Sequence, residues 1–214
     1  MITVLIAGIL GFIISFSAIP LFIKQMQKLK LGQLIREEGP AAHQHKAGTP
    51  TMAGFIFIPA AVVAYLLALL INAAVFGTSP VPSATALLTL GFTLGMLGVG
   101  AADDIMKFRN QGNEGLTENQ KTIGLLAMTL PFAYLVFQFP NAAGVTPAST
   151  AISFVRDLPF DFMAAGAIGG TILMVLWITL ISLSGTNAVN FTDGLDGLAG
   201  GATMTIFTGY LAMT

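Results

Sequence analysis

The residues best suited to chemistry lie in a short polar segment, residues 187–197, which follows a long apolar run without charge. Asn187, Asn190, Asp193 and Asp196 recur there at every third position. On a helix this spacing produces one slowly drifting polar stripe, and the glycine after each aspartate indicates that the helix has ended. Carboxylate and amide oxygens at the end of a membrane helix suit a hard cation and phosphates. The same residue types are also typical of a helix C-cap followed by a turn.

A second acidic cluster directly follows another apolar run, where Asp103 and Asp104 are adjacent and Lys107 comes three and four residues later. Two acids at a helix C-terminus face the negative end of the helix dipole, and a bound divalent cation would relieve their repulsion. If the helix continues, Lys107 shares their face. The cluster therefore suits phosphate bridged by Mg²⁺, and an ordinary helix stop with self-neutralised charges is the simpler alternative.

The remaining candidates lie in connecting segments between apolar runs. Lys46 can meet a phosphate or a carbonyl, Thr51 could cap the helix that follows it, and Lys121 can extend to the membrane interface. His43 and His45 have the spacing of metal ligands, but no third soft ligand accompanies them, so we expect no transition-metal site there.

The composition is that of an integral membrane protein, because 55% of the 214 residues are hydrophobic and only 9% are charged, against about 25% charged in soluble domains. The absence of cysteine excludes disulfide and thiol chemistry. Apolar runs of about 20 residues must form helices to satisfy their backbone in lipid. We therefore expect an all-α polytopic helical bundle, one transmembrane domain over residues 1–214, with five complete spanning helices and most of a sixth. The runs cover residues 2–23, 52–76, 84–102, 122–139, 163–184 and 198 onward.

The distribution of basic residues predicts the orientation of these helices. Eight of the nine lysines and arginines lie in the first and third connections, which the positive-inside rule makes cytoplasmic, with the N-terminus outside. All the candidate acids then lie at the cytoplasmic surface. The outer connection over residues 140–162 has strand character at 150–156, which predicts a small extracytoplasmic β-hairpin to which we assign no chemistry.

Taken together, these segments resemble the polyprenyl-phosphate N-acetylhexosamine-1-phosphate transferases, and within them the phospho-N-acetylmuramoyl-pentapeptide transferases of bacterial peptidoglycan synthesis. The similarity covers essentially the whole chain in order. Ala53 stands where that branch usually has glycine. The matching segments are residues 43–52, Asp103-Asp104-x-x-Lys107, Lys121 and residues 187–199.

The resemblance implies transfer of phospho-N-acetylmuramoyl-pentapeptide from its UDP conjugate to undecaprenyl phosphate, which gives lipid I and UMP and requires Mg²⁺. It implies Asp104 and Asp193 as metal ligands, Asp103 as the residue that deprotonates or orients the lipid phosphate, and Lys107 and Lys121 as phosphate ligands. A one-step reaction and a covalent two-step reaction both remain open. The substrate-binding residues that it implies are Lys46, Thr51, Lys121, Asn187, Asn190 and Asp196.

The resemblance also implies a larger protein, because members have about ten spanning helices and this sequence reaches the sixth. A later Gly-Asp-x-Gly-Ser segment and a loop with consecutive histidines, both part of the family's active site, are absent. We therefore expect a C-terminally truncated chain with little or no transferase activity by itself.

The expected setting is the inner membrane of a bacterium, with undecaprenyl phosphate, the UDP conjugate and membrane lipid as partners. A homodimer is compatible with the resemblance, and we expect no nucleic-acid partner. Three alternatives stay open: a transferase that uses UDP-N-acetylglucosamine, an ion-coupled transporter, and a non-catalytic membrane scaffold. Transport sites lie near the bilayer midplane, whereas the acids here follow the ends of the apolar runs.

Overall fold

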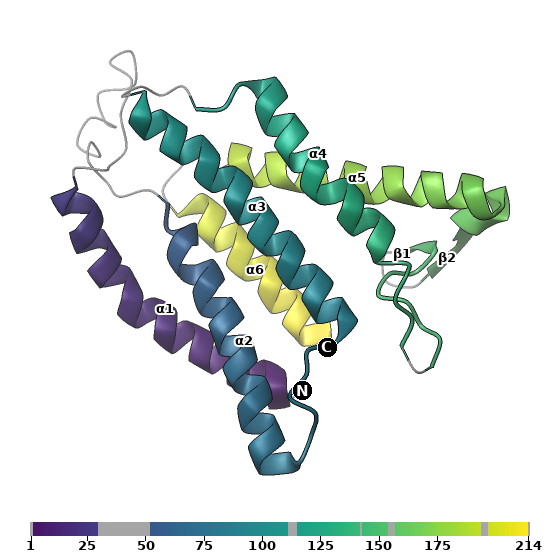
Figure 1. Ribbon diagram of the computed structural model, residues 1–214, viewed down its shortest axis with the longest axis horizontal. Helices are drawn as coiled ribbons and strands as arrows, with labels where there is room; N and C mark the ends of the chain where they lie inside the picture. Colours follow the sequence, from purple (N-terminus) through teal and green to yellow (C-terminus); the bar gives the residue numbers. More distant parts are fainter. Residues whose placement is uncertain are drawn as a thin grey trace. The chain divides into compact units, whose positions relative to one another are not determined.

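The computed structural model describes residues 2–29, 52–110, 115–141, 143–153, 157–193 and 197–213. The chain divides into two compact units, an N-terminal unit (Met1–Met128) and a C-terminal unit (Thr129–Thr214), and the division falls within a helix. In chain order the elements are α1 (Ile2–Lys28), α2 (Gly54–Phe76), α3 (Ala84–Arg109), α4 (Glu118–Leu135), β1 (Ala151–Ser153), β2 (Asp157–Asp161), the 3-10 helix η2 (Phe162–Ala165), α5 (Ala167–Thr192) and α6 (Leu198–Met213) (Figure 1).

The predicted all-α architecture is confirmed, and the described residues contain an α-helix at each of the six apolar runs. Four of these helices, α1, α2, α3 and α5, are long and apolar enough to cross a membrane, which makes this a multi-pass membrane protein. The 18-residue α4 opens with the polar turn Glu118-Asn-Gln-Lys121, which lowers its mean hydropathy. The 16 residues of α6 are shorter than a typical span.

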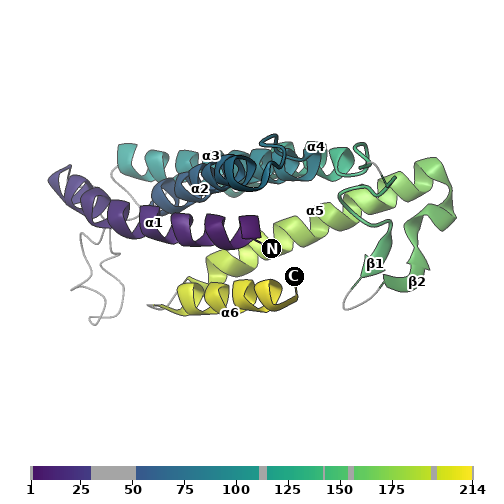
Figure 2. The same cartoon turned by 90° about the horizontal axis from the view of Figure 1, so that it is seen from below.

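The N-terminal unit contains a close antiparallel contact between α1 and α2, which lie side by side in both views (Figures 1 and 2). Ala60, Ala64 and Ala68 recur every four residues on α2 and are buried. Residues this small let two helix backbones approach closely in a membrane. One position further along the same stripe, the Asn72 side chain donates a hydrogen bond to Thr3 Oγ1 on α1 at 2.8 Å. A polar pair thus closes one end of an apolar seam.

The third helix continues beyond the apolar run in which it begins. It begins after Ser83, whose hydroxyl accepts a hydrogen bond from the Ala86 N–H at 3.2 Å. It continues past the end of the apolar run at residue 102 as far as Arg109. Lys107 and Arg109 occupy the last turn, where positive charges interact favourably with the helix dipole. Asp103 and Asp104 therefore do not stop the helix, which was the simpler alternative, and both lie inside its last two turns.

The C-terminal unit contains the predicted hairpin, in which β1 pairs antiparallel with β2 just before α5 (Figure 2). Asp161 joins the hairpin to η2 because one carboxylate oxygen accepts the Met163 N–H at 2.8 Å and the other accepts the Thr150 hydroxyl at 3.2 Å. The η2 segment then folds against α5, where the ring centroids of Phe162 and Trp177 lie 6.2 Å apart. The hairpin is thereby fixed to the beginning of α5.

Candidate functional site

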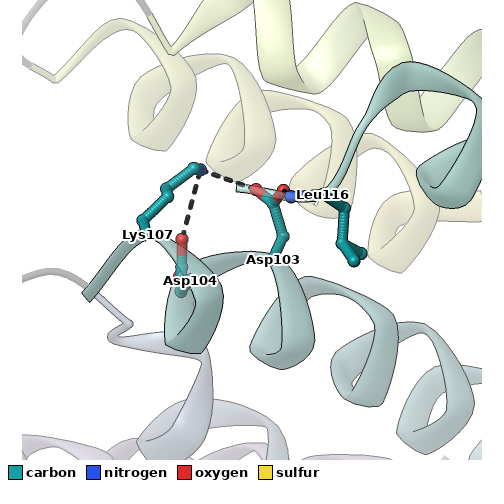
Figure 3. Close-up of polar contacts among 4 residues, drawn as sticks. All are labelled: Asp103, Asp104, Lys107 and Leu116. Atoms are coloured by element: carbon teal, nitrogen blue, oxygen red, sulfur yellow. Dashed lines mark hydrogen bonds and ion pairs between the residues drawn. The ribbon is translucent and has the colours of Figure 1, made fainter. Parts of the chain in front are cut away.

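Two acids and one lysine form an ion-paired cluster near the C-terminal end of α3 (Figure 3). The Lys107 ammonium nitrogen lies 2.6 Å from Asp103 Oδ2 and 3.4 Å from Asp104 Oδ1. This confirms that Lys107 shares a helix face with both acids, as its spacing predicts. A single ammonium group lies between two carboxylates and reduces their mutual repulsion.

Asp103 is the more enclosed of the two acids, and both of its oxygens are engaged. Its side chain is 13% exposed, and Oδ1 accepts a hydrogen bond from the Leu116 N–H at 2.9 Å while Oδ2 meets Lys107 (Figure 3). A carboxylate held on both sides in this way is well placed to fix its neighbours. It thus joins the end of α3 to the segment that leads into α4.

Asp104 has a different environment from its neighbour, although the two residues are adjacent and identical in type. Its side chain is 32% exposed, and its ion pair with Lys107 is longer than that of Asp103. A partly exposed carboxylate beside an ammonium group offers an oxygen to a hard cation and a positive charge to an anion. This part of the cluster is therefore suited to a phosphate group that carries a divalent cation.

A reciprocal capping arrangement fixes the start of α4 and with it Lys121. The Gln120 N–H donates to Thr117 Oγ1 at 3.3 Å, and the Thr117 N–H donates to Gln120 Oε1 at 3.1 Å, which is the capping-box pattern. The Lys121 N–H donates to the Thr117 carbonyl at 2.9 Å in the same turn. The charge of Lys121 attracts the Asp103 carboxylate, so a second lysine belongs to the surroundings of the cluster.

The polar segment after the fifth apolar run lies at the end of α5 in the C-terminal unit. Asn187 and Asn190 are on the helix, which ends at Thr192, and Asp193 is its C-cap, with its N–H donated to the Val189 carbonyl at 3.1 Å. The predicted helix end is confirmed. The side chains of both asparagines and of Asp193 are exposed, and Asn187 donates to the Leu183 carbonyl of its own helix at 2.9 Å.

The predicted site residues thus fall into three sets. In the N-terminal unit the structure brings Lys107 against Asp103 and Asp104, with Lys121 in electrostatic range of Asp103. Within the parts of the chain that the structure describes, no group of three or more histidine, cysteine or acidic side chains is arranged to hold a metal ion. The second set, at the end of α5, is Asn187, Asn190 and Asp193. The third set lies outside the described residues and consists of Lys46, Thr51 and Asp196.

Sequence reasoning missed the residues that join α3 to α4. Thr117 and Gln120 had a usable signal, because threonine followed three residues later by glutamine predicts a capping box. Gly115 and Leu116 had none, since their contact with Asp103 involves residues that are 12 and 13 positions away along the chain.

Curated relatives match this chain along its whole length. The phospho-N-acetylmuramoyl-pentapeptide-transferase of Kocuria rhizophila is 45% identical over 214 residues, which is 100% of this chain and 57% of the relative. The proteins of the same name from Micrococcus luteus and Kineococcus radiotolerans are 45% and 43% identical, over 100% and 98% of this chain and 57% and 56% of their own lengths. The chain therefore spans somewhat more than half the length of the relatives that it matches. No solved structure matches it significantly.

A family model, described as glycosyl transferase family 4, matches residues 86–214. The match takes in both acids of α3, Lys107, Lys121 and the polar segment at the end of α5. It extends over more than half of the chain and, among the described helices, covers nearly all of α3 and the whole of α4, α5 and α6. On this evidence the chain belongs to glycosyl transferase family 4.

Proposed function

We propose that this chain supplies part of the active site of an enzyme that transfers phospho-N-acetylmuramoyl-pentapeptide from its UDP conjugate to undecaprenyl phosphate, with lipid I and UMP as products. The observation that carries the proposal is the identity with transferases of that name along the whole chain. The ion-paired cluster on α3 supports the proposal. Its lysine can bind a phosphate oxygen, and its carboxylates can hold the divalent cation that accompanies the phosphate.

Phosphoryl transfer depends mainly on positioning and on neutralising charge. In this proposal Asp104 and Asp193 would hold Mg²⁺, and the ion would supply positive charge that stabilises the charge developing on the diphosphate. The donor set fits this ion, because both are carboxylates with accessible side chains and Mg²⁺ prefers oxygen ligands.

In this proposal Lys107 and Lys121 bind substrate phosphates, and Asp103 orients the phosphate of the lipid substrate. Lys107 has a side chain that is 38% exposed even while it pairs with the acids, so a phosphate oxygen can reach it. A phosphate monoester has a second pKa of about 6 and is largely a dianion at neutral pH, so the lipid phosphate needs no strong base. Asp103, with both oxygens engaged, suits orientation better than proton abstraction.

The nucleotide in this proposal binds at polar residues outside the α3 cluster, which are given below. The reaction takes place at the cytoplasmic face of the inner membrane, and the N-terminus lies outside. The asymmetry in basic residues supports this orientation. The proposed nucleotide-binding residues are Lys46, Thr51, Asn187, Asn190 and Asp196.

Three aspartate substitutions test the proposed activity. They are made in the longest natural reading frame that contains this sequence, and release of UMP is measured. We expect Asp103→Asn, Asp104→Asn and Asp193→Asn each to lower turnover about 100-fold or more, the usual cost of losing a charge that stabilises a transition state. Glu118→Gln is the matched control, because Glu118 is an exposed acid in the first turn of α4. Normal turnover in all three aspartate variants would contradict the proposal.

The sugar specificity is tested with the same preparation. UDP-N-acetylmuramoyl-pentapeptide and UDP-N-acetylglucosamine are supplied separately with undecaprenyl phosphate, and kcat/KM is compared. We expect turnover with the first substrate to exceed turnover with the second. The opposite preference would assign the chain to the N-acetylglucosamine branch.

A further inference from the structure

Gly115 lies so close to the acidic cluster that a Cβ atom at this position would require the segment or α3 to shift. A Cβ atom built on Gly115 would lie 2.8 Å from the backbone carbonyl oxygen of Asp103 and 2.9 Å from its carboxylate carbon. Real Cβ atoms essentially never approach other atoms this closely. The position therefore requires space against α3.

The contact lets the next residue bind the cluster through its backbone. With Gly115 against Asp103, the Leu116 N–H reaches Asp103 Oδ1 at 2.9 Å. The opposite oxygen of the same carboxylate holds Lys107 at 2.6 Å. One buried carboxylate thus fixes a lysine of its own helix and the polypeptide segment that begins the next helix.

The position of that segment is passed on to Lys121 by the helix cap. Thr117 directly follows Leu116, exchanges hydrogen bonds with Gln120, and accepts the Lys121 N–H at its carbonyl. Because these hydrogen bonds hold the first turn of α4 together, we expect a shift at residue 115 to be passed on to the backbone of Lys121.

We propose that Gly115 is a positioning residue for Lys121: by leaving room for the Leu116 N–H to bind Asp103, it holds the start of α4, and so the Lys121 ammonium group, beside the Asp103–Asp104–Lys107 cluster. Gly115 touches no substrate, and the inference rests on the proposed function for the role of Lys121 as a phosphate ligand. An alanine at this position pushes the segment away from α3 and weakens phosphate binding by Lys121.

A double-mutant cycle on the longest natural reading frame tests this role by release of UMP. We expect Gly115→Ala to lower kcat/KM about 10-fold or more, and to raise KM for the substrate whose phosphate Lys121 binds. In a Lys121→Ala background, Gly115→Ala should then lower kcat/KM by less than about 2-fold, since the effects of substitutions at residues that act through one another are not additive. Gly98→Ala is the control, because a Cβ at Gly98 of α3 meets nothing within 4 Å in the described residues. Full additivity of the two substitutions overturns the inference.

A second measurement needs no enzymatic activity and so separates this inference from the proposed function. A Cβ built on Gly124 of α4 would lie 3.9 Å from the Cβ of Val99 on α3, which matches the usual Cβ–Cβ distance of about 3.8 Å in a disulfide. The chain contains no cysteine, so Val99→Cys with Gly124→Cys introduces a unique pair. We expect it to form a disulfide on mild oxidation.

Addition of Gly115→Ala to this pair should slow disulfide formation several-fold, whereas addition of Gly98→Ala should leave it unchanged. Equal rates with and without Gly115→Ala overturn the inference, as does failure of the parent pair to cross-link. If the pair behaves as expected but UMP is never released, the proposed function fails and the positional role of Gly115 stands.

Discussion

At the scale of single residues, two adjacent aspartates of one helix have different surroundings and therefore different capacities. Asp103 is enclosed and binds a backbone N–H as well as Lys107, whereas Asp104 is about one-third exposed and meets Lys107 at a longer distance. A buried carboxylate with two partners is costly to disturb because its desolvation is compensated only while both partners are present. The enclosed acid organises the cluster, and the accessible acid is the one that can bind a ligand.

The first prediction at this scale concerns Lys107. Lys107→Gln removes the cation from two neighbouring carboxylates and leaves Asp103 Oδ2 without its ion-pair partner. We expect it to lower the free energy of unfolding by about 1–3 kcal/mol, the range for a lost hydrogen bond to a charged group. The measurement is the midpoint of thermal unfolding in detergent. Lys24→Gln on the exposed surface of α1 is the control, and equal midpoints for the two variants would show that the ion pair contributes nothing to stability.

At the scale of elements, small residues allow two pairs of helices, α1 with α2 and α3 with α4, to approach closely. In the first pair the small residues are the buried Ala60, Ala64 and Ala68 of α2. In the second pair the small residue is Gly124 of α4, where an added Cβ atom would lie 3.1 Å from a methyl group of Val99 on α3. Because hydrophobic burial gives no net drive for helices to associate within lipid, close van der Waals contact must stabilise these pairs.

The second prediction follows from the seam between α1 and α2. Ala64 is fully buried, and its Cβ lies 3.6 Å from the position a Cβ on Gly11 would occupy. Ala64→Leu forces the helices apart, and we expect a loss of about 1–3 kcal/mol, as for other overpacked sites. Val63→Leu is the matched control, since Val63 is the preceding residue of α2 and is exposed. Thermal unfolding in detergent distinguishes the two, and an Ala64→Leu variant as stable as the control would contradict this packing.

At the scale of the whole molecule, the described residues form a polytopic helical membrane protein. The sequence covers somewhat more than half the length of the relatives that it matches. Large apolar side chains such as Phe12, Phe16 and Ile168 are exposed, which is expected where lipid rather than water surrounds the helices. The α3 cluster belongs to the N-terminal unit, and the polar end of α5 belongs to the C-terminal unit.

The third prediction concerns orientation, which the asymmetry of basic residues predicts. Ser79 precedes α3 and Asn119 is in the first turn of α4, and both are exposed. Because the chain has no cysteine, Ser79→Cys and Asn119→Cys each introduce a unique thiol. We expect a membrane-impermeant maleimide to label Ser79→Cys in intact spheroplasts and Asn119→Cys only after permeabilisation. The reverse pattern would invert the orientation and place the acids outside.

The sequence by itself determined the features that arise from local interactions. Long apolar runs can satisfy their backbone in lipid only as helices, so the six helices were predictable, and the pairing of Lys107 with both acids follows from helical spacing. The sequence left open whether α3 continues past its apolar run, and the structure extends the helix to Arg109, with Lys107 and Arg109 in its last turn.

Only the tertiary structure decided which of the two acids is enclosed and which is accessible. The hydrogen bond from Leu116 to Asp103 joins residues 13 positions apart, and that from Asn72 to Thr3 joins residues 69 positions apart. No periodicity of the sequence encodes such contacts, because they depend on how closely two helices approach. That approach depends in turn on the absence of a side chain at a few positions such as Gly115.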